Sequence, residues 1–110
     1  MIDETIQRIE KTIGENETLD ENRKKELMDL VAHLKNEIDN LGDTHREDAG
    51  SIASYAESSV REAVRSEVDA ELLQHTLDGL SLSVRRFEIS HPMLIGIINN
   101  IGRILNQIGV

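Results

Sequence analysis

The last eighteen residues of the chain, Met93–Val110, constrain its fold more than any other stretch, because their apolar side chains recur at helical intervals. In a helix over 92–109, one face carries seven large aliphatic side chains: Leu94, Ile97, Ile98, Ile101, Ile104, Leu105 and Ile108. A stripe of this width is stable only when other apolar side chains cover it. The rest of the chain must therefore supply matching apolar faces, which favours an all-α fold.

The opposite face of this terminal helix is polar but almost uncharged. Arg103 is its one charged side chain, although the whole chain has a formal net charge of −9. A glycine inside a helix costs roughly 1 kcal/mol relative to alanine, and the close approach of a second helix would explain that cost. In the alternative interpretation, the two glycines of this face, Gly96 and Gly102, are tolerated surface residues. We predict an interface on this face, formed by Gly96, Asn99, Asn100, Gly102, Arg103, Asn106 and Gln107.

Residues 1–42 predict a helical hairpin. Isoleucines spaced by four, three and four positions line one side of a first helix: Ile2, Ile6, Ile9 and Ile13. This helix should end near Gly14. A second helix is expected from about Asp20 to Leu41, with Thr18 or Asp20 as its N-cap and Gly42 after its end. The connection is short, so the two helices should be antiparallel.

The segment 43–50 has a charge at half of its positions and no apolar periodicity, so we predict a loop there. An apolar stripe then resumes and continues to Ser90. No proline or glycine lies near Ser66, so residues 51–90 form either one long helix or two consecutive helices. The spacing of four from Val60 to Leu72 would rotate the stripe around a straight helix, and this drift favours a bend near Ser66.

Pro92 marks the clearest break in the sequence, because proline disfavours helical geometry in the residue before it and fits the first turn of a new helix. The terminal helix should begin there, with Ser90 or His91 as its cap.

The residues around this break also carry a family resemblance. The run Arg86-Phe87-Glu88-Ile89-Ser90-His91-Pro92, followed by an amphipathic terminal helix, resembles an uncharacterised family of short bacterial helical proteins, classed as a domain of unknown function. The segment Thr18–Leu27 is similar to that family's early Leu-Asp-Glu motif, so the likeness covers the first hairpin and the chain from about Glu71 onward. The resemblance implies an all-α fold and supplies no catalytic residues.

Composition excludes several classes of function. The acidic surface repels phosphate backbones, and Tyr55 and Phe87 are the only aromatic residues, so nucleic-acid binding is not expected. The chain has no cysteine, which excludes thiolate chemistry and fits a reducing cytoplasm. The start of the chain lacks the basic and apolar regions of a signal peptide, and the terminal helix has too many polar residues to span a membrane.

A few residue pairs have spacings found in metal sites. Glu88 and His91 show the Glu-x-x-His spacing that di-metal helical bundles use, but the apolar stripes contain no further glutamates to complete such a site. The break at Pro92 also disturbs the geometry of the pair. A structural cap or packing contact is therefore the preferred interpretation, and neither a metal nor another cofactor is assigned. The serines lack both a nucleophile elbow and an adjacent base, so the protein is not expected to be an enzyme.

These observations predict a cytoplasmic all-α protein of four to five helices in an antiparallel hairpin or bundle, completed by dimerisation. The preferred function is a non-catalytic protein–protein interaction or scaffold module, with a second copy or an unidentified protein as its partner. One alternative is a peripheral membrane-surface protein whose terminal amphipathic helix detaches and lies among lipid headgroups. The other alternative is a metal-binding helical bundle.

Overall fold

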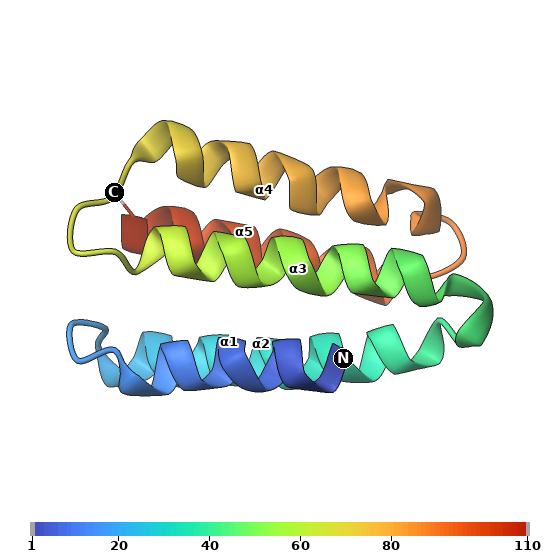
Figure 1. Cartoon of the computed structure of the whole chain (residues 1–110), viewed down its shortest axis with the longest axis horizontal. Coiled ribbons are helices and arrows are strands. Elements are labelled where there is room, and N and C mark those ends of the chain that lie inside the picture. Colours follow the sequence, from blue (N-terminus) through green and yellow to red (C-terminus); the bar gives the residue numbers. More distant parts are fainter. Residues whose placement is uncertain (1, 110) are drawn as a thin grey trace.

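The computed structural model describes residues 2–109 and contains five α-helices joined by short turns (Figure 1). The helices are α1 (Ile2–Glu15), α2 (Glu21–Asn40), α3 (Arg46–Ala63), α4 (Ala70–Val84) and α5 (Pro92–Gly109), with two short 3-10 helices, η1 (Asp43–His45) and η2 (Arg85–Phe87). No β-strand occurs between residues 2 and 109. The all-α class with four to five helices is therefore confirmed.

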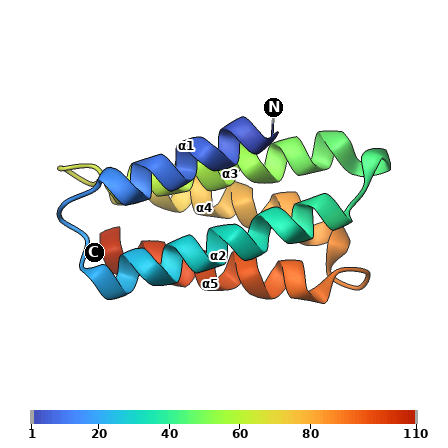
Figure 2. The same ribbon diagram turned by 90° about the horizontal axis from the view of Figure 1, so that it is seen from below.

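The helices form three layers (Figure 1). The first layer holds α1 and α2, and the middle layer holds α3 and α5; Figure 2 shows α1 running beside α3 and α2 beside α5. These four helices form a bundle in which α1 contacts α2 and α3, and α5 contacts α2 and α3. The third layer is α4 alone, which packs against both α3 and α5.

The core of this bundle is aliphatic. The first-helix stripe points inward, since Ile6, Ile9 and Ile13 are each at most 1% exposed. The α5 stripe is buried at the centre of the molecule, where it meets apolar side chains from the neighbouring helices. Its buried members are Leu94, Ile97, Ile98, Ile101, Ile104 and Leu105. The terminal helix thus forms a central part of the core.

The turn between α1 and α2 is held by side-chain caps. Asp20 is the N-cap of α2, and its carboxylate accepts a hydrogen bond from the Arg23 backbone N–H at 2.8 Å. Thr18, the alternative cap, instead donates its hydroxyl to the side-chain oxygen of Asn16 at 2.7 Å. Gly14 lies within α1, one residue before its end. Gly42 follows α2 with a φ of +79°, a conformation that glycine adopts without strain.

The loop expected over 43–50 is mostly helical. A 3-10 turn covers Asp43–His45, and α3 begins at Arg46. Glu47 and Asp48 lie in the first turn of α3, where carboxylates interact favourably with the positive end of the helix dipole. The charges that indicated a loop therefore belong to a helix N-terminus.

Residues 51–90 form two helices, and the break falls near the expected bend. The chain leaves helical geometry after Ala63, and α4 starts behind Asp69, whose carboxylate accepts from the backbone N–H groups of Glu71 and Leu72. Because this turn is not helical, the buried face of α4 does not continue the buried face of α3 at a spacing of four. Leu73 is 3% exposed, whereas Leu72, placed in the stripe from the sequence, is 46% exposed.

The break before α5 lies where proline indicates it. Pro92 is the first residue of α5. The His91 carbonyl accepts from the Leu94 N–H at 3.1 Å, so His91 occupies the cap position by its backbone.

Candidate functional site

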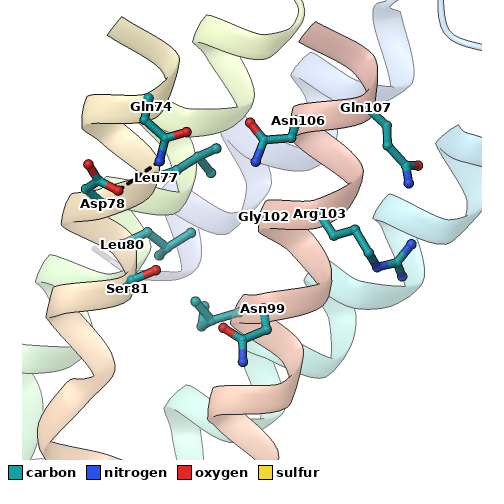
Figure 3. A pocket seen from close by; sticks show the side chains of 11 residues that line it. Gln74, Leu77, Asp78, Leu80, Ser81, Asn99, Gly102, Arg103, Asn106 and Gln107 are labelled. Atoms are coloured by element: carbon teal, nitrogen blue, oxygen red, sulfur yellow. Dashed lines mark hydrogen bonds between the residues drawn. The ribbon is translucent and has the colours of Figure 1, made fainter. Parts of the chain in front are cut away.

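A groove runs between α4 and α5 on the outer side of the molecule (Figure 3). It has a volume of about 510 Å³. Its lining residues come from these two helices: Gln74, Leu77, Asp78, Leu80, Ser81, Ile98, Asn99, Gly102, Arg103, Asn106 and Gln107. The groove therefore combines an apolar floor with polar walls.

The floor of the groove is made of core side chains. Leu77 and Leu80 of α4 and Ile98 of α5 are all buried. Gly102 lies opposite Leu77: a Cβ built at position 102 would be 3.9 Å from Leu77 Cδ2, an ordinary contact distance. The glycine is not demanded by the packing of α4 against α5, but its missing side chain widens the floor between the two walls.

The walls present hydrogen-bonding groups without partners. Within residues 2–109, the side chains of Asn99, Arg103 and Asn106 make no hydrogen bond or ion pair with the protein. On α4, Gln74 Nε2 donates to Asp78 Oδ1 at 2.8 Å, which leaves Asp78 Oδ2 available. Exposed amides, a guanidinium and a carboxylate can satisfy the polar groups of a bound protein surface.

The formal charges of the groove cancel. Asp78 and Arg103 are its only ionised side chains, with a net charge of zero. The other residues of the chain then include 11 Lys and Arg against 20 Asp and Glu, because the whole chain has 12 and 21. The groove is thus a neutral surface on a strongly acidic protein, so it repels an acidic partner less than the rest of the surface does.

The structure brings five of the seven predicted interface residues into this groove: Asn99, Gly102, Arg103, Asn106 and Gln107. Gly96 and Asn100 lie on α5 but do not line it. Gln107 also accepts a hydrogen bond from Arg23 Nη1 of α2 at 2.8 Å, so it connects the groove to the neighbouring helix.

The α4 wall is the part that the sequence did not reveal. Gln74, Asp78 and Ser81 alternate with buried leucines on an amphipathic helix, which is the pattern of an ordinary solvent-exposed face. Nothing in the pattern of either helix indicates that α4 neighbours α5. Only the spatial order of the helices combines the two polar faces into one site.

Glu88 and His91 lie at the end of the bundle, away from the groove. Glu88 is exposed, and the His91 ring meets the Phe87 ring edge-on at a centroid distance of 5.6 Å. Ser90 Oγ lies 2.9 Å from His91 Nδ1. Among residues 2–109, no three His, Asp or Glu side chains cluster so as to hold a metal ion. The geometry is that of a packing contact around Phe87.

A second histidine closes the same end of the bundle. The His45 ring meets Phe87 edge-on at 5.2 Å, and its Nδ1 lies 3.3 Å from Asp48 Oδ2. The same oxygen accepts from Arg86 Nη1 at 2.9 Å. Desolvation raises the pKa of Asp48, but hydrogen bonds from His45 and Arg86 outweigh it and leave the pKa below its ordinary value. These contacts join the start of α3 to η2.

A family model described as "Domain of unknown function (DUF4404)" matches residues 30–110. The chain belongs to this family. The matched range contains the break at Pro92, the terminal helix and both walls of the groove. It also includes 43–65, which lies outside the resemblance that the sequence shows, whereas the Thr18–Leu27 segment lies before the matched range. No curated protein and no solved structure matches the chain.

None of the helices between residues 2 and 109 is long and apolar enough to cross a membrane.

Proposed function

We propose that this protein is a non-catalytic interaction module that binds a protein partner across the groove between α4 and α5. The observation that carries the proposal is the set of unpartnered polar side chains, Asn99, Arg103 and Asp78 Oδ2 among them, placed over an apolar floor. Protein interfaces have this composition, with apolar contact at the centre and hydrogen-bonding groups around it.

The length of the groove suits a helical partner. Its lining spans Gln74 to Ser81 on α4 and Ile98 to Gln107 on α5, which corresponds to about 10 to 14 Å along the helices. Partner helices of two to three turns, packed against α4 and α5, cover that length. A nucleic acid fits less well, because the surrounding surface is acidic.

A catalytic role has little support in the groove. Ser81 is its only hydroxyl group, and no histidine or second carboxylate lines the groove to activate that hydroxyl as a nucleophile. The polar side chains suit recognition through hydrogen bonds. The absence of cysteine fits the cytoplasm as the place where this recognition occurs.

The membrane-surface alternative requires α5 to leave the bundle. Its apolar face includes Leu94 and Leu105, both 0% exposed, in contact with the rest of the core. Detachment would expose this stripe and the matching faces of α2, α3 and α4 to water. The burial of α5 therefore supports the groove, and not the apolar face, as the binding surface.

Site-specific photo-crosslinking in cells that produce the protein tests the proposal. A photoreactive amino acid at Asn106, in the groove, should give discrete protein adducts, and the same group at Asn40, the exposed last residue of α2, should not. The adducts should disappear when Gly102→Trp fills the groove in a chain that still folds. Equal labelling at both positions, no adduct at Asn106, or adducts that survive Gly102→Trp would contradict the proposal.

A further inference from the structure

We propose that the partner that covers the groove is a second copy of this chain, related by a two-fold axis that runs along the groove, so that the two grooves face each other and Arg103 of each protomer pairs with the partner's Asp78. This inference rests on the proposed function of the same groove and names its partner. Three features of the groove support it: the positions of its two charges, their available bonding capacity and the neutrality of the surface.

The two charges lie at matching positions on opposite edges of the groove. Figure 3 shows Asp78 on the side of α4 that faces away from α5, and Arg103 on the side of α5 that faces away from α4. Gly102 lies opposite Leu77, and Asp78 and Arg103 are the next residues on each helix. Because α4 and α5 run in opposite directions, the two positions are offset by about 3 Å along the groove, a distance that the long Arg103 side chain can span.

A two-fold axis parallel to the helices exchanges the two edges of the groove and leaves the position of each residue along the groove unchanged. It places the partner's α4 over α5 and the partner's α5 over α4, so that Asp78 faces Arg103 at both edges. A two-fold axis that crosses the groove at right angles to the helices, at the level of Arg103, would instead place α5 over α5 and bring the two Arg103 side chains together. Like charges in contact are strongly unfavourable, so the charge pattern favours the parallel axis over this arrangement.

Both members of the proposed pair have bonding capacity that the single chain does not use. Arg103 has no partner among residues 2–109, and Asp78 uses one oxygen to accept from Gln74. Asn99 and Asn106 add donors and acceptors on the same face, which a two-fold axis duplicates. Leu82, one helical turn after Asp78, is 57% exposed and supplies apolar area at the edge of the interface.

The neutrality of the groove favours association of identical chains. Two copies with a formal charge of −9 each repel one another, and their contact is least unfavourable where the local charge is zero. An unrelated neutral partner would experience no such repulsion, so for that partner a neutral binding surface would offer no advantage. Self-association also needs no other gene product to complete the interface.

Sedimentation equilibrium of the purified full-length chain tests the pairing by charge exchange. The unaltered chain should form a dimer, and Arg103→Glu and Asp78→Arg should each weaken dimerisation by about ten-fold or more. An equimolar mixture of the two variants should recover the dimer, because each edge of the mixed interface then holds one acidic and one basic side chain. The double variant Arg103→Glu/Asp78→Arg should recover it as well, since it reverses the pair at both edges.

Net charge provides an internal control. Arg103→Glu changes the formal charge from −9 to −11, whereas Asp78→Arg changes it from −9 to −7. General repulsion would therefore move the two variants in opposite directions, and a local pair weakens both. Lys25→Glu, at an exposed position of α2, changes the charge by the same −2 and should leave dimerisation within about two-fold of the unaltered chain. Circular dichroism establishes that each variant is helical.

The outcomes separate this inference from the proposed function. A monomer in sedimentation, together with a groove-dependent adduct to a different protein at Asn106, would overturn the second-copy inference and leave the interaction function standing. A dimer that neither single variant weakens, or that the mixture does not restore, would overturn the proposed two-fold pairing. A monomer with no adduct at Asn106 would overturn both.

Discussion

The aromatic ring of Tyr55 on α3 lies against the backbone of Gly79 on α4. A Cβ built at position 79 would be 2.6 Å from Tyr55 Cδ1 and 2.9 Å from Cζ, closer than carbon atoms approach in proteins. The ring therefore occupies the space that a side chain would need. Glycine lets α4 pack closely on α3, whereas the contact between α4 and α5 leaves room for the groove.

Gly79→Ala should lower the free energy of unfolding by about 1 kcal/mol. The methyl group would force the Tyr55 ring outward, and overpacking of this kind costs about 1 to 3 kcal/mol, against a gain of about 1 kcal/mol from helix propensity. Urea denaturation measures the difference. In a Tyr55→Ala chain the same substitution should become stabilising, and the double-mutant cycle isolates the clash.

Gly50→Ala is the matched control for this substitution. Gly50 also lies inside a helix, α3, but a Cβ there meets nothing within 4 Å. The substitution should raise the free energy of unfolding by about 0.5 to 1 kcal/mol. A gain of the same size for Gly79→Ala would show that the ring moves aside at no cost, contrary to the expectation.

Ser59→Ala should stabilise the protein. Ser59 is fully buried in α3, and its hydroxyl has no hydrogen-bond partner among the described residues. A buried hydroxyl without a partner carries an uncompensated desolvation cost, and alanine has the higher helix propensity, so a gain of about 1 kcal/mol is expected in urea denaturation. Ser54→Ala, at an exposed position of the same helix, should give less than half of that gain. A loss of stability at Ser59 would show that its hydroxyl is satisfied.

The architecture follows from patterns that the sequence displays directly. The isoleucines of α1 and the aliphatic residues of α5 repeat at helical spacing without interruption. Both stripes are buried except at Ile2 and Ile108, which are partly buried. Leu72 is the exposed member of the expected α4 stripe, because the spacing of four from Val60 to Leu72 crosses the turn between α3 and α4. A non-helical turn changes the rotation between two helices, and the side-chain pattern does not record that change.

The loop predicted over 43–50 is wrong because the prediction rests on local charge. Residues 43–50 have few apolar side chains because the start of α3 lies at the end of the bundle, where Ala49 is the only side chain of the segment to be buried. Their carboxylates fit a helix N-terminus as well as they fit a loop. Hydrophobic periodicity therefore has little power at helix ends that project beyond the core.

Glu57 should make stability depend on pH in the acidic range. Arg8 Nε donates to Glu57 Oε2 at 2.6 Å and Nη2 donates to Oε1 at 3.3 Å, which joins α1 to α3. These hydrogen bonds lower the pKa of Glu57 below its ordinary value of 4.5. The stabilisation is therefore complete above pH 4.5 and is lost as the pH falls through the lower folded-state pKa.

Glu57→Gln should consequently be less stable than the unaltered chain at pH 7, by a modest amount typical of a partly exposed ion pair. The difference should shrink as the pH is lowered below 4.5. Glu15→Gln is the control at pH 7, because Glu15 meets Lys11 only at 4.0 Å on an exposed face, so its loss should change the free energy of unfolding less than Glu57→Gln does. Denaturation series at several pH values provide the measurement, and a difference that is constant with pH would contradict the assignment.

Native-state hydrogen exchange should show that α4 opens at a lower free energy than α5. The outer face of α4 is in solvent and the helix packs mainly on α3 and α5, whereas α5 packs against α2, α3 and α4 and buries its apolar stripe among them. The amides of Ile101 and Ile104 should therefore exchange only through global unfolding, and those of α4 through a smaller opening. Exchange of the α5 amides before those of α4 would contradict the core position of α5. It would instead support the alternative in which α5 detaches and binds a membrane surface.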